Sequence, residues 1–183
     1  ALAFFAAPDF KDLRLQPVER PFSDDKRRNV IAFSLQGDDR IYTEGAVENA
    51  EMAPHLYPSW TCRYYVDETV PAGIIRRLKN HGADVVAVDR ADRGPHEGAW
   101  RFYAADDAGI DRFVCRDCNT RLSVQERAAV DEWIRSRRAV HIMRDHVFHN
   151  ELIPAGLWGA VRGALPPLKP LIASGRWFTH NRY

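Results

Sequence analysis

Four polar residues that could bind a metal or a phosphate lie close together in the sequence: Arg116, Asp117, Asn119 and Arg121. A carboxylate followed two residues later by a second oxygen ligand can hold a hard divalent cation, and adjacent arginines can neutralise phosphate. This combination suits a nucleoside diphosphate with bound manganese or magnesium. The alternative is a polar strand-to-helix turn in which Asp117 accepts hydrogen bonds from backbone amides, because Asp and Asn are common in turns.

The same stretch contains a C-x-x-C pair, Cys115 and Cys118, which allows two other interpretations. A redox dithiol needs its first Cys at a helix N-terminus, where the thiolate is stabilised, but Cys115 is predicted to end a strand. A zinc site needs two more ligands, and the His-x-x-His pair of His146 and His149 has a gap shorter than the usual finger spacing. Two buried, inert cysteines are therefore the favoured interpretation.

A second polar cluster, Asp145, His146 and His149, follows a predicted strand over 139–143. It belongs to a loop that we expect at the same edge of the sheet as Asp117. The histidines are candidates for contact with a ligand, and Asp145 is a candidate general base. The alternative is a loop turn that Asp145 caps.

Six stretches between residues 29 and 159 carry a family resemblance: FSLQGDDRIYTEGAVENAEMAPHLYPSW, CRYYVDETVP, WRFYAADD, DRFVCRDCNTRLSVQERAAVDEWI, HIMRDHVFHN and GLWG. They resemble the bacterial A-type glycosyltransferases, which are nucleotide-sugar-dependent enzymes with a single Rossmann-like domain. Relatives of this kind read R-D-A-D-S-R where this chain has RDCNTR at 116–121. The D-x-D of that family binds a divalent metal that bridges the two phosphates of the sugar donor.

The resemblance implies a divalent metal, manganese or magnesium, on Asp117 and Asn119, completed by His146 or His149. Asn119 stands where the family has its second Asp, so the site loses a negative charge but keeps a carbonyl oxygen ligand, and metal affinity should fall. Three outcomes stay open. The protein binds metal only together with the nucleotide, works without metal, or is a decayed homologue.

The resemblance also implies donor or acceptor contacts for three further residues. Tyr42 would contact the base or ribose of the donor, Arg101 would pair with a phosphate, and Trp158 would stack on a sugar at the acceptor side. Each has a structural alternative. Tyr42 can wedge against the helix that follows it, Arg101 can pair with Asp106 or Asp107, and Trp158 can pack in the core.

Hydrophobic periodicity predicts the elements that position these residues. Strands are expected at 29–35, 61–66, 83–88, 111–115 and 139–143, and helices from Thr43, from Pro71, over 100–107 and after a Ser123–Glu126 capping box. The alternation predicts an α/β fold, a mostly parallel sheet with helices on both faces. The resemblance makes this the Rossmann-like A-type glycosyltransferase fold. Ligands of such sheets bind outside the carboxyl ends of the strands.

The 183 residues predict one domain in three parts. Residues 1–28 form an irregular N-terminal lead-in, 29–153 a nucleotide-sugar-binding α/β domain, and 154–183 a Gly- and Pro-rich C-terminal wrap with one short helix at most. A net charge of +1 gives no global basic field, so nucleic acid is not an expected partner. Three cysteines fit the cytoplasm, and no apolar run approaches the roughly 20 residues of a transmembrane segment.

We therefore expect a cytoplasmic glycosyltransferase that moves a sugar from a nucleoside diphosphate donor, with a UDP-sugar favoured, to an unknown acceptor. Arg116, Arg121 and metal on Asp117 would stabilise the leaving group, with Asp145 as the base. One alternative is a non-catalytic nucleotide- or glycan-binding module, because of Asn119 and the short chain. A nucleotidyltransferase is less favoured, since no glycine-rich phosphate loop follows the first strand.

Overall fold

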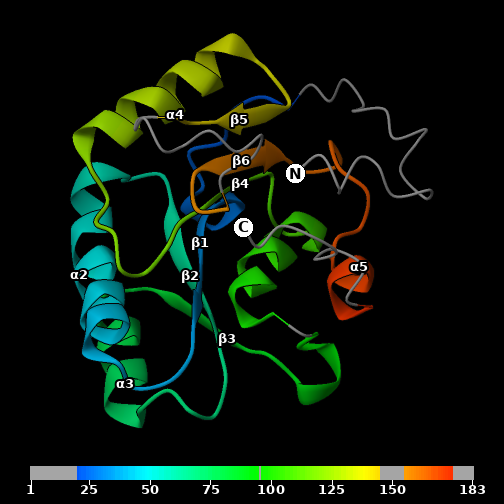
Figure 1. Cartoon of the computed structure of the whole chain (residues 1–183). Coiled ribbons are helices and arrows are strands. Elements are labelled where there is room, and N and C mark those ends of the chain that lie inside the picture. The colour runs from blue at the N-terminus through cyan, green and yellow to red at the C-terminus, as the bar shows by residue number, and fades with distance from the viewer. Residues whose placement is uncertain (1–19, 95, 145–154, 175–183) are drawn as a thin grey trace.

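The computed structural model describes residues 20–94, 96–144 and 155–174. Its centre is a six-stranded sheet of order β3-β2-β1-β4-β6-β5 (Figure 1). The strands are β1 (Asn29–Leu35), β2 (Thr61–Val66), β3 (Asp84–Ala87), β4 (Arg112–Cys115), β5 (Val140–Ile142) and β6 (Trp158–Val161). The first four pair in parallel, and β6 runs antiparallel to both of its neighbours. The prediction of an α/β fold with a mostly parallel sheet is confirmed.

Helices cover both faces of this sheet, as predicted. One face carries α2 (Arg40–Leu56), α3 (Ala72–Asn80) and α4 (Val124–Ser136) (Figure 1). The other carries the 3-10 helix η4 (Glu97–Asp106) and the short helix α5 (Lys169–Ala173). Two 3-10 turns, η2 (Lys26–Arg28) and η3 (Arg90–Asp92), precede β1 and follow β3.

The central strand, β1, has the continuous apolar run that burial on both sheet faces requires. Ile31, Phe33 and Leu35 pack on the side of α2, and Val30 and Ala32 pack on the side of η4. All five side chains are at most 1% exposed. This pattern is typical of a strand in the middle of a parallel sheet, and the strand predicted from it is confirmed.

Local capping sets the ends of the helices. The helix that was expected to begin with Thr43 as its cap begins earlier, because the Asp39 carboxylate accepts a hydrogen bond from the Ile41 amide at 2.9 Å and caps α2. The capping box of α4 is confirmed. Ser123 Oγ accepts from the Glu126 amide at 3.2 Å, and the Glu126 carboxylate accepts from the Ser123 amide at 3.3 Å.

Two strand predictions need correction. The third strand was expected over 83–88, but β3 covers only Asp84–Ala87 and is an edge strand with partly exposed side chains. The stretch after residue 154 was expected to be irregular apart from one short helix. It does contain α5, but it also contains β6, which pairs with β4 and β5. Within the described ranges, no helix is both long and apolar enough to span a membrane.

Candidate active site

β1 and β4 lie side by side at the point where the strand order reverses. The chain runs outward from β1 through β2 to β3, then returns to place β4 on the other side of β1. In open α/β sheets, ligands bind outside the carboxyl ends of the strands at such a switch point. The segments that follow these two strands are 36–39 and 116–121, so the predicted RDCNTR cluster lies at this position.

Asp117 is partly exposed and forms an ion pair with a buried arginine. It follows β4, and its side chain is 44% exposed. Its carboxylate forms an ion pair with Arg101 of η4, whose own side chain is 9% exposed. Arg101 Nη1 also donates to the carbonyl oxygen of Arg116 at 3.2 Å. The buried guanidinium therefore both orients the carboxylate and neutralises its charge.

The pairing of Arg101 differs from the structural alternative that the sequence allowed. It does not pair with Asp106, which caps α5 by accepting from the amides of Leu168 and Lys169 at 2.8 and 2.7 Å. Nor does it pair with Asp107, which forms an ion pair with Arg63 at 2.5 Å. Arg101 contacts another predicted site residue instead, and its burial places it behind Asp117 rather than at the surface.

Gly156 covers one side of the Asp117 carboxylate. A Cβ atom at this glycine would lie 2.0 Å from Asp117 Oδ2 and 2.8 Å from Cγ. Only a residue without a side chain fits so close to a fixed carboxylate. Gly156 belongs to the GLWG stretch, so the sequence contained a signal for this contact, although only Trp158 was singled out there.

Arg116 points away from the switch point, which corrects its predicted role in neutralising phosphate. Its guanidinium forms a buried ion pair with Glu126 of α4, with both side chains about 10% exposed (9% and 11%). It also donates to the Gly156 carbonyl at 2.8 Å and to Thr120 Oγ1 at 3.2 Å. Alternation along a strand explains this, because Arg116 faces the same side as Val114, and Asp117 faces the side of Cys115.

Arg121, Asn119 and Tyr42 lie at the surface. Arg121 forms an ion pair with Glu48 of α2 and is 38% exposed. Asn119 is exposed, and Tyr42, in the first turn of α2, is 43% exposed. These three side chains are therefore accessible to a ligand, in contrast to Arg116.

Two residues of α2 that sequence reasoning missed hold the 118–121 loop in place. Asn49 is fully buried; its side chain donates to the Thr120 carbonyl at 2.8 Å and accepts from the Leu122 amide at 2.9 Å. Gly45 packs directly against the carbonyl oxygen of Cys118. Both are poor helix formers inside a helix, which is a sequence signal for a packing role.

A substitution at Gly45 tests this packing. In the alanine variant, the Cβ would lie 2.1 Å from the Cys118 carbonyl oxygen. We expect Gly45→Ala to lower the free energy of unfolding by about 1–3 kcal/mol in urea denaturation. Gly73→Ala in α3 is the matched control, because its nearest neighbour is the end of Arg76 at 4.0 Å and alanine favours a helix by up to about 1 kcal/mol. Equal stability of the two variants would contradict the close packing.

The cysteines have the properties of buried, inert thiols. Burial raises the pKa of both Cys115 and Cys118, which is opposite to what a nucleophilic or metal-binding thiolate requires. Cys118 Sγ lies 3.3 Å from the Ser34 carbonyl oxygen, and both thiols are free. The favoured interpretation from the sequence therefore agrees with the structure.

Trp158 is buried in β6, which corrects its predicted role at the acceptor side. It is 4% exposed, and its ring packs on Phe113 and Phe102 with centroids 5.2 and 5.4 Å away. No face of the ring is free to stack on a sugar. The other late candidates, the base Asp145 and the metal ligands His146 and His149, lie outside the described residues.

The predicted metal ligands in the described part of the chain do not make a metal site on their own. Asp117 is already neutralised by Arg101, and Asn119 carries no charge. No group of three or more His, Cys, Asp or Glu side chains in the described ranges is arranged to hold a metal ion. A dication on Asp117 would also face the buried guanidinium of Arg101, which like-charge repulsion disfavours.

The fold and this geometry define an α/β domain with a half-exposed acidic residue at the switch point of its sheet. Comparison with models of known protein families gives no match, and comparison with curated proteins gives none either.

Proposed function

We propose that the protein is a glycosyltransferase that takes a sugar from a nucleoside diphosphate donor, with a UDP-sugar favoured, and passes it to an acceptor. One observation carries the proposal: Asp117 is a half-exposed carboxylate at the switch point, held in one orientation by the buried Arg101. The resemblance of RDCNTR to the family motif R-D-A-D-S-R supports the same assignment.

The reaction breaks the bond between the anomeric carbon of the sugar and a diphosphate oxygen. Negative charge moves to the departing diphosphate, and positive charge develops at the anomeric carbon, so the protein must position the reactants and stabilise both charges. Asp117, fixed by Arg101, is placed to accept hydrogen bonds from hydroxyl groups of the donor. Because Arg101 fixes the orientation of Asp117 before the donor binds, the Asp117 side chain loses little conformational entropy on binding.

Arg121 is the residue of this loop that can reach the diphosphate. Its partner Glu48 is on the surface, with a side chain 52% exposed, and such an exposed ion pair contributes only about 0–1 kcal/mol. Arg121 can therefore leave Glu48 and bind a diphosphate with only a small loss of free energy. Arg116 does not contact the donor in this proposal and instead holds the loop against α4.

The acceptor hydroxyl needs a base, and Asp145 keeps that proposed role. No step is assigned to a metal, because the described ligands do not form a site for one. Whether nucleotide binding depends on manganese is therefore measured in the titration that follows.

Calorimetric titration with UDP, GDP and ADP, each with manganese and with EDTA, tests the proposal. We expect heat of binding with at least one of them, and the tightest binding with UDP. Arg121→Gln should weaken that binding about tenfold, because it removes a charged hydrogen bond. Arg27→Gln is the control, since Arg27 pairs with Asp25 at the opposite end of β1. Absence of heat with all three nucleotides would refute the proposal.

A second candidate is a non-catalytic module that binds a nucleotide or a glycan. Two features favour it: Asn119 is uncharged, and the charge of Asp117 is compensated by Arg101. Both reduce the negative charge available for catalysis. Donor hydrolysis separates the two functions. Turnover that appears only after Asn119→Asp would support the binding module, and turnover by the parent protein would exclude it.

A further inference from the structure

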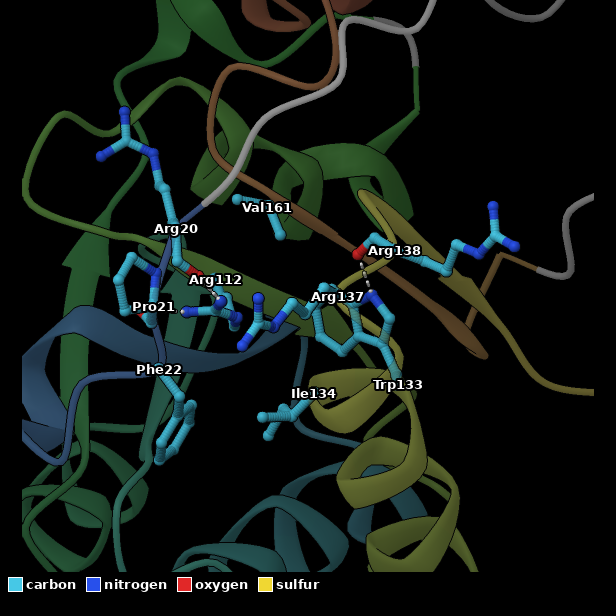
Figure 2. A pocket seen from close by; sticks show the side chains of 9 residues that line it. All are labelled: Arg20, Pro21, Phe22, Arg112, Trp133, Ile134, Arg137, Arg138 and Val161. Atoms are coloured by element: carbon cyan, nitrogen blue, oxygen red, sulfur yellow. Dashed lines mark hydrogen bonds between the residues drawn. The ribbon is translucent and has the colours of Figure 1, made fainter.

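A cavity of about 300 Å³ lies at the other end of β4 from Asp117 (Figure 2). Arg112, the first residue of β4, lines it, whereas Asp117 lies two residues beyond the last residue of that strand. The rise of a strand, about 3.3 Å per residue, places the two residues roughly 15 Å apart. The cavity is therefore separate from the switch-point site.

The walls of the cavity combine basic and apolar side chains. Four arginines line it: Arg20, Arg112, Arg137 and Arg138. Phe22, Trp133 and Ile134 provide the apolar surface, and no acidic residue is among the lining residues. A small concave site with apolar walls and a few convergent polar groups is the usual form of a ligand pocket.

Arg112 is a buried cation held by neutral partners. It is 5% exposed and donates from Nη1 to the carbonyl oxygen of Pro21 at 3.1 Å and from Nη2 to that of Arg20. Burial lowers its pKa, the charge of Asp111 raises it in part, and the charge of Arg20 lowers it. Its guanidinium also lies 5.7 Å from the ring centroid of Phe22. A buried cation without a bonded carboxylate is costly unless an anion compensates it.

The nearby carboxylate, Asp111, supplies only part of that compensation. Asp111 accepts from Arg28 at 2.5 Å and from Arg20 at 3.4 Å, and Arg162 lies 4.0 Å away. One carboxylate is thus shared among three other arginines before Arg112 is counted. In the described part of the chain, Arg137 and Arg138 form no ion pair either, so positive charge is in excess around the cavity.

The arginines differ in direction. In Figure 2 the guanidinium groups of Arg112 and Arg137 point into the space between Pro21 and Trp133, whereas those of Arg20 and Arg138 point away from it. Arg137 has a left-handed backbone, with φ at +55°, where it ends α4. A basic residue is favourable at a helix C-terminus in any case, but that explains neither the burial of Arg112 nor the cavity between the two.

We propose that this cavity binds a phosphate monoester with a small apolar body. The two negative charges of the phosphate would face Arg112 and Arg137, which match them in number and can donate to phosphate oxygens in pairs. The apolar body would contact Phe22, Trp133 and Ile134. This ligand site is independent of the nucleotide-sugar site proposed above, and its occupant does not compete with a nucleotide.

Calorimetric titration of the whole protein with phenyl phosphate tests the proposal, with inorganic phosphate, benzoate and phenol as comparison probes. Phenyl phosphate should bind more tightly than the other three, and added salt should weaken its binding. Tighter binding of benzoate would overturn the phosphate assignment, and absence of phenyl phosphate binding would overturn the site. Displacement of phenyl phosphate by UDP would also overturn it, because the two sites would then be one.

Two variants at the end of α4 provide a matched pair. Arg137→Asn keeps a residue that tolerates the left-handed backbone, so the fold should survive, and phenyl phosphate binding should weaken about tenfold or more. Arg138→Gln removes the same charge one residue later and should change the affinity by less than about threefold. Equal effects of the two variants, or none from Arg137→Asn, would contradict the proposal. Arg137→Lys should restore part of the affinity.

Discussion

Arg116→Met is expected to lower the free energy of unfolding by about 3–5 kcal/mol, because it removes the buried guanidinium that forms an ion pair with the Glu126 carboxylate. Both side chains are nearly buried, and Glu126 also completes the capping box of α4. Arg116 further bonds the Gly156 carbonyl, so the variant should loosen the β4–α4 loop from the segment that enters β6. Urea denaturation measures the loss.

Two comparison variants serve as controls for this measurement. Arg77→Met removes an ion pair with Glu44 whose side chains are 45% and 34% exposed, so it should lower the stability far less than Arg116→Met does. Arg116→Met combined with Glu126→Leu removes both charges and should recover a large part of the stability. If Arg116→Met lowered the free energy of unfolding no more than Arg77→Met does, Arg116 would not be buried as described. Arg116 would then be an exposed residue that binds phosphate, as the sequence predicted.

Asp117→Asn is expected to lower kcat/KM for transfer from the donor by about 10²–10³, the usual effect of removing one preorganised electrostatic group. The asparagine has the same shape but no charge. It therefore cannot neutralise Arg101 or stabilise the positive charge that develops at the anomeric carbon. The measurement is release of nucleoside diphosphate over time with the preferred donor.

Asp131→Asn is the control for this change. Asp131 pairs with Arg127 on α4 and is 35% exposed, so its removal should leave kcat/KM unchanged. Circular dichroism of both variants checks that each is folded. If Asp117→Asn retained the parent kcat/KM within about threefold, Asp117 would be a structural turn residue, which is the alternative that the sequence also allowed.

Local patterns predicted the fold well because their causes are local. The apolar run of β1 and the Ser123–Glu126 capping box depend on near neighbours in the chain, and both are confirmed. β6 was missed because a four-residue strand such as Trp158–Val161 acquires its identity from pairing with β4 and β5, which are distant in the sequence. The same long-range placement buries Trp158.

The candidate site was predicted in position but not in its internal pairing. The RDCNTR cluster does follow β4 at the switch point, since strand ends are readable from hydrophobicity. The partner of Asp117 could not be read, because Arg101 comes from a different crossover segment. The inward turn of Arg116 was readable in principle, since the alternation of β4 places it on the side of Val114 and therefore toward α4.

We propose that a nucleotide-sugar donor binds beside Asp117 at the switch point between β1 and β4. A crystal structure of the protein soaked with UDP and manganese tests this placement. We predict density for the nucleotide outside the carboxyl ends of β1 and β4, with the diphosphate within hydrogen-bond distance of Arg121 and a hydroxyl group of the nucleotide toward Asp117. Nucleotide density elsewhere on the molecule, or none at a concentration that saturates binding in solution, would contradict the claim.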